Sequence, residues 1–146
     1  MAVRSREDRM KSPRAVLLDT SAWIAFLGST EHDDLKAATQ QALRAERVWS
    51  CPVVVAELLV GARDRAALTK LRNLLGALPR VDIDENLWMQ AAELGFVLRR
   101  KGVTAPLPDL LIAAACRLHS LEVWHLDEHY EQICAVTELR TRSFLG

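Results

Sequence analysis

The sequence has few cysteines and lacks any long apolar run. Its three cysteines, Cys51, Cys116 and Cys134, are widely separated and form no Cys-x-x-Cys pair. We therefore expect small buried residues in a reducing compartment rather than a disulfide framework. No segment approaches the roughly 18 apolar residues of a membrane span, and the N-terminus lacks the apolar core of a signal peptide. The sequence therefore predicts a cytoplasmic protein with no membrane partner.

A net charge is also lacking, because 19 basic residues balance 19 acidic ones in the 146-residue chain. No overall basic field therefore indicates a nucleic-acid partner. The distribution is nevertheless uneven. Residues 1–14 contain five basic and two acidic residues, a net charge of +3, which leaves −3 for residues 15–146. The first segment is polar and contains Ser12-Pro13, so we expect a flexible basic tail over 1–14 and a single domain over 15–146.

What the sequence does contain is carboxylates among apolar residues. Four acids lie within or at the end of apolar runs: Asp19 in AVLLDTSAWI, Glu57 in CPVVVAELLVGA, Asp109 in PLPDLLIAAA and Asp127 in VWHLDEHY. An ionised carboxylate in such surroundings costs several kcal/mol of desolvation, so it is protonated, paired with a base or bound to a cation. Four such groups in one domain suggest a shared cation.

Each acid can instead have a separate local role. Asp19 and Asp109 can cap the helices that follow them, and Asp127 can initiate a turn. Glu57 does not fit this interpretation, because we expect it in the middle of a helix with apolar neighbours on every side. The capping interpretation therefore stays open for three of the acids.

Short apolar runs alternate with helical patterns along the chain. This alternation predicts an α/β fold with a parallel sheet whose strands are joined by right-handed crossovers. The expected strands are Ala15–Leu18, Val48–Ser50, Arg80–Ile83, Glu122–Leu126 and a short fifth over Val136–Leu139. The expected helices are Ser21–Leu27, Asp33–Glu46, Pro52–Ala62, Arg65–Leu78, Asn86–Lys101 and Asp109–His119.

This organisation allows the four acids to converge. In an open α/β sheet the functional crevice lies beyond the carboxyl ends of the strands. Asp19 and Asp127 each follow a strand, and Glu57 and Asp109 lie within about two turns of the start of a covering helix. Oxygen donors alone suit Mg²⁺ or Mn²⁺ more than zinc. Such a site suits phosphodiester hydrolysis, in which the cation activates a water and neutralises charge on the phosphate and leaving oxygen.

Two alternative chemistries are less well supported. A zinc site could use Cys116, His119, His125, His129 and Cys134, but their spacing is not that of a zinc finger. We instead consider His129 a candidate substrate contact at the mouth of the acidic site, with a plain surface position as the alternative. The segment LLDTSAW is also similar to that of phosphotransferases with an Asp nucleophile, which need a second Asp where this chain has Ser21.

Four motifs together carry a resemblance to a known family. They are LLDTSAWI, VVVAELLVGAR, PDLLIAAACRLH and VWHLDEHYEQI, with 38 residues from Asp19 to Glu57 and 18 from Asp109 to Asp127. In this order and spacing, the chain from Ala15 to about Leu139 resembles the PIN-domain family, in particular the VapC-like toxins of bacterial toxin–antitoxin pairs. The resemblance implies a three-layer α/β/α sandwich with a mostly parallel, four- to five-stranded sheet.

The resemblance also implies a site and an activity. The positions that match the family's acidic quartet, implied to be both catalytic and metal-binding, are Asp19, Glu57, Asp109 and Asp127. Ser21 matches the hydroxyl residue two places after the first acid. As the fourth acid we prefer Asp127 to Glu128, because it directly follows the expected strand. The implied protein is an Mg²⁺-dependent endoribonuclease, with Mn²⁺ as a substitute, that cuts RNA, is neutralised by a cognate antitoxin and forms a homodimer. The alternative is a non-catalytic PIN fold that binds RNA or a partner.

Overall fold

The computed structural model describes residues 14–28 and 31–145. Four short strands in this part of the chain form one sheet, β1 (Val16–Leu18), β2 (Val48–Trp49), β3 (Glu122–His125) and β4 (Thr141–Ser143). The strand order is β2-β1-β3-β4, and every neighbouring pair is parallel. The parallel sheet expected from the alternating pattern is therefore confirmed. Most of the expected tail, residues 1–13, lies outside the described residues.

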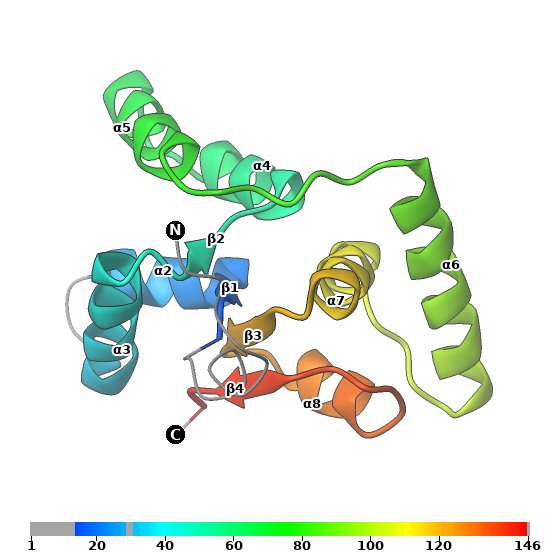
Figure 1. Cartoon of the computed structure of the whole chain (residues 1–146). Helices are drawn as coiled ribbons and strands as arrows, with labels where there is room; N and C mark the ends of the chain where they lie inside the picture. Colours follow the sequence, from blue (N-terminus) through cyan, green and yellow to red (C-terminus); the bar gives the residue numbers. More distant parts are fainter. Residues whose placement is uncertain (1–13, 29–30, 146) are drawn as a thin grey trace, which may run out of the picture.

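Helices cover the sheet on both faces. In the described residues they are α2 (Thr20–Leu27), α3 (Asp33–Arg44), α4 (Pro52–Val60), α5 (Arg65–Gly76), α6 (Glu85–Arg100), α7 (Leu107–His119) and α8 (Glu128–Cys134). Figure 1 shows α2 and α3 on one side of the sheet and α7 and α8 on the other, with α6 on the outer side of α7. The three-layer α/β/α arrangement is therefore confirmed. Among the described helices, none combines the length and apolar character needed to cross a membrane.

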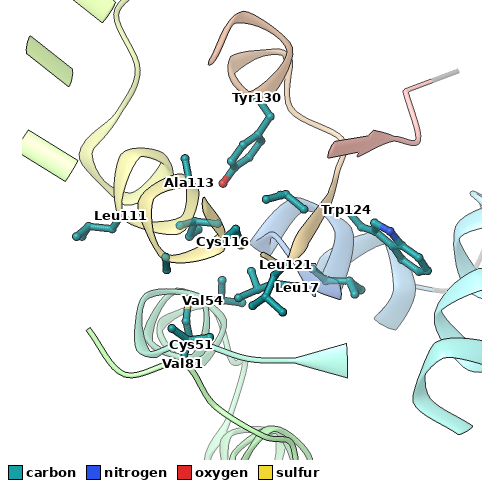
Figure 2. Packing of buried hydrophobic residues seen from close by; sticks show 14 of the residues in the cluster. Leu17, Cys51, Val54, Val81, Leu111, Ala113, Cys116, Leu121, Trp124 and Tyr130 are labelled. Carbon is teal, nitrogen blue, oxygen red and sulfur yellow. The ribbon is translucent and has the colours of Figure 1, made fainter. Parts of the chain in front are cut away.

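The core lies where β1 and β3 meet the central helix α7. All three residues of β1 are buried, and so is every residue of α7 from Asp109 to Cys116. Leu17, Val54 and Cys116 lie in this core, as Figure 2 shows. Burial also raises the pKa of the Cys116 thiol well above its usual value. As expected, Cys51 and Cys116 are buried, whereas Cys134 is only partly buried.

The expected strand at Arg80–Ile83 is wrong. This segment makes one isolated bridge, between Ser50 and Arg80. The Val81 N–H donates to the Ser50 carbonyl at 2.8 Å, but no further ladder follows. The reason is local, because Asp84 already caps α6 by accepting from the backbone N–H of Leu87 at 2.9 Å. The chain therefore turns into a helix before a strand can extend.

The expected fifth strand at Val136–Leu139 is also wrong. The backbone N–H groups of Val136 and Thr137 both donate to the carbonyl of Ile133, at 3.1 and 3.0 Å. These bonds form the turn that ends α8, so the donors are not free to pair with β3. The last strand lies a few residues later at Thr141–Ser143. The sheet accordingly has four strands, within the expected range of four to five.

Candidate active site

The candidate site lies beyond the carboxyl ends of β1 and β3. The chain passes from β1 to β2 on one side and later returns to β3 on the other side of β1, so the strand order reverses there. Such a reversal opens a crevice at the carboxyl ends of the two central strands. Asp19 follows β1 directly, and its backbone N–H donates to the Trp124 carbonyl of β3 at 2.9 Å. Asp127 comes two residues after the end of β3.

Asp19 is held by three hydrogen bonds in a nearly buried position. Its side chain caps α2, because Oδ2 accepts from the Ser21 backbone N–H at 3.1 Å and from the Ser21 hydroxyl at 2.7 Å. Its other oxygen, Oδ1, accepts from the Tyr130 hydroxyl at 2.8 Å. Ser21 Oγ in turn accepts from the Leu126 N–H at 3.1 Å. Ser21 therefore fixes Asp19 and also joins α2 to the loop after β3.

Asp109, Asp127 and His129 form a compact cluster. One donor atom from each residue lies within 4.8 Å of the other two. His129 Nδ1 lies 3.1 Å from Asp109 Oδ2 and 2.9 Å from Asp127 Oδ1. Asp127 also caps α8, since Oδ1 accepts from the His129 backbone N–H at 2.9 Å. The structure thus places Asp127 in the cluster, whereas Glu128 is the first residue of α8.

The charges in this cluster alter the acidity of its two carboxyl groups in opposite directions. Burial, followed by the negative charges of Asp127 and Asp19, raises the pKa of Asp109 from 3.8 to about 7. Burial alone would also raise the pKa of Asp127, but the backbone N–H and imidazole of His129 lower it overall. Burial and the neighbouring negative charges together therefore keep the proton on Asp109 to a higher pH than in a free aspartic acid.

Glu57 differs from the other three acids. It lies on α4 as expected, but its side chain is exposed, because the buried residues of that helix are Val54 and Leu58. The expectation of a desolvated Glu57 is therefore wrong: apolar neighbours in sequence do not surround it in space. Its Oε1 accepts from the Thr20 hydroxyl at 2.9 Å. This bond places Glu57 beside Thr20, the residue that follows Asp19. Glu57, like Asp19, lies outside the close group of Asp109, Asp127 and His129.

The capping interpretation holds for two acids and fails for a third. Asp19 and Asp127 are the N-caps of α2 and α8, whereas Pro106 precedes α7 and Asp109 is the third residue of that helix. Capping does not exclude a role in the site, because the capped helix starts face the same crevice. The partial positive charge at these helix N-termini favours carboxylates there. The two interpretations drawn from the sequence are thus compatible.

Three residues with close contacts to the site were missed from the sequence. Tyr130 is fully buried, donates to Asp19, and is shown in Figure 2 with its hydroxyl pointing inward. Thr20 contacts Glu57. His125 is also fully buried and accepts through Nδ1 from the Asp127 N–H at 3.2 Å. Only Tyr130 could have been identified from the sequence. It is the one tyrosine of the chain, and it follows the candidate site residue Asp127 by three residues.

The zinc interpretation is wrong for the residues that the structure describes. The group of close donor atoms found there is Asp109, Asp127 and His129, and it includes no cysteine. Cys116 is buried in the core, and the Cys134 thiol donates to the Leu139 carbonyl at 3.3 Å. The expectation that His129 lies at the acidic site agrees with this geometry. The His129 ring lies within the acidic site, in contact with the carboxylates of Asp109 and Asp127, and not only at the entrance to the site.

Comparisons with known proteins agree with this geometry. The PIN domain family matches residues 16–136. VapC ribonuclease Mb1587 of Mycobacterium bovis is 31% identical over 134 residues, covering 88% of this chain and 98% of that protein. Ribonuclease VapC21 of Mycobacterium tuberculosis is 33% identical over 125 residues, covering 83% and 87%. The structure of VapBC2 from Rickettsia felis, bound to a promoter DNA fragment, superposes with a TM-score of 0.71 at 19% identity, covering 88% and 97%. The chain belongs to the PIN-domain family, within its VapC group.

Proposed function

We propose that this protein is a cytoplasmic, metal-dependent endoribonuclease that acts as the toxin of a toxin–antitoxin pair. The observation that carries the proposal is the close group of Asp109, Asp127 and His129 at the carboxyl ends of β1 and β3, with Asp19 near enough that its negative charge helps to raise the pKa of Asp109 to about 7. Mutually repelling carboxylates are costly to hold together unless a cation binds them. The relatives named above are ribonucleases by name, which supports the same reaction for this chain.

The donor set fits a divalent cation. Asp109 Oδ2 and His129 Nδ1 are buried atoms with no hydrogen-bond partner, as expected for donors reserved for a ligand. Carboxylate oxygens are the ligands that Mg²⁺ and Mn²⁺ prefer. When bound, such a cation supplies an activated water and neutralises charge on the phosphate. Asp19, Asp109 and Asp127 are the residues that would hold it.

The remaining residues of the quartet and its neighbours have separate proposed roles. Glu57 is exposed and tied to Thr20, so it is placed to contact the attacking water or substrate rather than to be a buried ligand. Ser21 orients Asp19 through two hydrogen bonds, which is a positioning role. The side chains of His129 and Asp127 are 39% and 29% exposed, so an RNA backbone, whose phosphates carry the scissile bond, can reach the acidic cluster.

The proposed partners are a cognate antitoxin and a second copy of the chain. Another structural neighbour, VapBC-5 from Mycobacterium tuberculosis, is named as a member of the VapBC family of toxin–antitoxin systems, which supports an antitoxin partner. A homodimer is supported by apolar side chains that one chain leaves uncovered on adjacent helices. Val60 at the end of α4 is 87% exposed, and Leu74 on α5 is 38% exposed. The basic segment 1–14 is proposed as a tail that attracts RNA phosphates.

The alternative function is a PIN fold that binds RNA or a partner without cutting. Such a module has no use for a cluster of mutually repelling carboxylates, and this cost favours the enzyme. Titration with a divalent ion discriminates between the two. The enzyme should gain thermal stability from Mg²⁺ or Mn²⁺, because the ion binds only the folded state. A binding module without a metal site should not.

Cleavage of total bacterial RNA by the purified, antitoxin-free protein tests the proposal. We expect cleavage with Mg²⁺ or Mn²⁺ and none with EDTA. Asp109→Asn should abolish cleavage while antitoxin binding persists, since the substitution keeps the shape of the side chain. Glu93→Gln is a matched control, because this exposed acid lies on α6 outside the acidic cluster. Wild-type cleavage by Asp109→Asn, or loss of cleavage by Glu93→Gln, would overturn the assignment.

A further inference from the structure

The imidazole of His129 has an unusual position between two acids. Nδ1 lies 3.1 Å from Asp109 Oδ2 and 2.9 Å from Asp127 Oδ1, yet neither contact has hydrogen-bond geometry. Both Nδ1 and Asp109 Oδ2 are buried atoms without a hydrogen-bond partner. Leaving a buried donor and a buried acceptor unpaired at such short range is costly, because a small rotation would align them. A simple ion pair between His129 and the two carboxylates therefore does not explain these short but misaligned contacts.

The spacing of these atoms matches that of neighbouring ligands around one cation. In a six-coordinate site with bonds of roughly 2.0–2.1 Å, adjacent donor atoms are about 3 Å apart. The distances from Nδ1 to the two carboxylate oxygens have this value. Ligand atoms direct their lone pairs at the shared cation and not at each other, which accounts for contacts that are short but misaligned. The backbone N–H of His129, which donates to Asp127, also fixes the start of α8 relative to that acid.

From this geometry we propose that His129 Nδ1 is a direct metal ligand and that the site consequently binds Mn²⁺ more tightly than Mg²⁺. This inference rests on the proposed metal-dependent function and specifies its cation. Mg²⁺ binds oxygen and retains several waters, whereas an imidazole nitrogen suits first-row transition metals. The oxygen-only donor set expected from the sequence thus becomes a mixed set of nitrogen and oxygen.

Pulsed electron paramagnetic resonance of the Mn²⁺-loaded protein tests the ligand directly. A coordinated imidazole gives a hyperfine coupling from its nitrogen, and we expect this coupling in the wild type. His129→Gln should lose it. The side chain of His129 is 39% exposed, so this substitution should leave the fold intact. His129→Ala, which offers no replacement oxygen, should lose the coupling as well. His119→Gln is the matched control, because His119 is an exposed histidine at the end of α7.

Metal preference gives a second measurement. Titrations followed by melting temperature should give a lower dissociation constant for Mn²⁺ than for Mg²⁺ in the wild type and in His119→Gln. Loss of even an outer contact to a metal ligand typically costs tenfold or more in affinity, so His129→Gln should weaken Mn²⁺ binding by at least about tenfold. Its binding of Mg²⁺ should change less.

The outcomes separate this inference from the proposed function. If wild-type protein binds Mn²⁺ without a nitrogen coupling, or if His129→Gln retains the coupling, His129 is not a ligand, although the metal-dependent site stands. If the wild type binds neither Mn²⁺ nor Mg²⁺, both the inference and the proposed function are wrong.

Discussion

The raised pKa of Asp109 predicts that the metal-free protein becomes less stable as the pH increases from about 4 to 7. Within this window the folded protein keeps a proton on Asp109 that the unfolded chain has lost, because the pKa is about 7 in the fold against 3.8 in the free residue. The folded state then binds more protons than the unfolded state, so stability decreases as pH rises. Asp109→Asn mimics the protonated side chain and should remove this dependence.

The size of the effect follows from the shift. Roughly three pKa units at 1.36 kcal/mol each give a ceiling of about 4 kcal/mol. The side chain is 12% exposed, and its repulsion by Asp127 and Asp19 is partly screened by water, so we expect about half that value, near 2 kcal/mol. In a chain of this length, that corresponds to a melting temperature about 4–8 °C higher for Asp109→Asn than for the wild type at pH 8.

The assay is thermal or urea unfolding in EDTA, with both proteins measured from pH 4.5 to 8. The difference between the two curves reports Asp109 and the groups coupled to it, such as Asp127, because groups elsewhere contribute equally to both proteins. His125 is one such group: burial lowers its pKa, so its contribution to stability is lost as the pH falls below about 6.5, the ordinary value. If the variant is less stable than the wild type at pH 8, or if the difference does not vary with pH, the pKa of Asp109 is not raised in the folded protein.

Three further substitutions or deletions test separate contacts. Tyr130→Phe leaves Asp19 Oδ1 without its buried donor, so urea unfolding should show a loss of about 1–3 kcal/mol, and an unchanged midpoint would mean that the bond is unimportant. Glu57→Gln, at an exposed position, should change stability by less than about 0.5 kcal/mol and slow RNA cleavage by at least about tenfold; the opposite pattern would make Glu57 structural. Deletion of residues 1–13, which carry a net charge of +2, should leave cleavage intact and weaken RNA binding mainly at low salt, because this electrostatic attraction is screened by salt. Identical binding at low salt would show that the tail contributes nothing.

Much of the fold could be predicted because the buried strands are short apolar runs. Val16–Leu18 and Glu122–His125 are recognisable in this way, and the acids that follow them locate the crevice. β4 was missed because Thr141–Ser143 is polar and partly exposed, so no apolar pattern marks it. Its pairing with β3 depends on the turn after α8, which local sequence does not specify.

In the candidate site, too, the residues next to a recognisable strand could be predicted, whereas contacts between residues far apart in the sequence could not. Asp19 and Asp127 could be placed from the strands that precede them. The hydrogen bond from Tyr130 to Asp19 joins residues 111 positions apart, and no local pattern predicts such a contact. The exposure of Glu57 was missed for a related reason. Apolar neighbours along the sequence indicated burial, but the helical rotation of α4 directs Val54 and Leu58 inward and Glu57 outward.

The chemistry of the RNA ends distinguishes metal-assisted hydrolysis from other routes of RNA cleavage. Hydrolysis by a metal-activated water breaks the bond to the 3′ oxygen and leaves a 5′-phosphate and a 3′-hydroxyl. Sequencing of the fragments from total bacterial RNA treated with the protein and Mn²⁺ should therefore recover 5′-phosphate ends that are absent in EDTA and in Asp109→Asn. Fragments that end in 2′,3′-cyclic phosphates, or that form equally well in EDTA, would show that the RNA is not cut by metal-assisted hydrolysis, and the proposed reaction would be wrong.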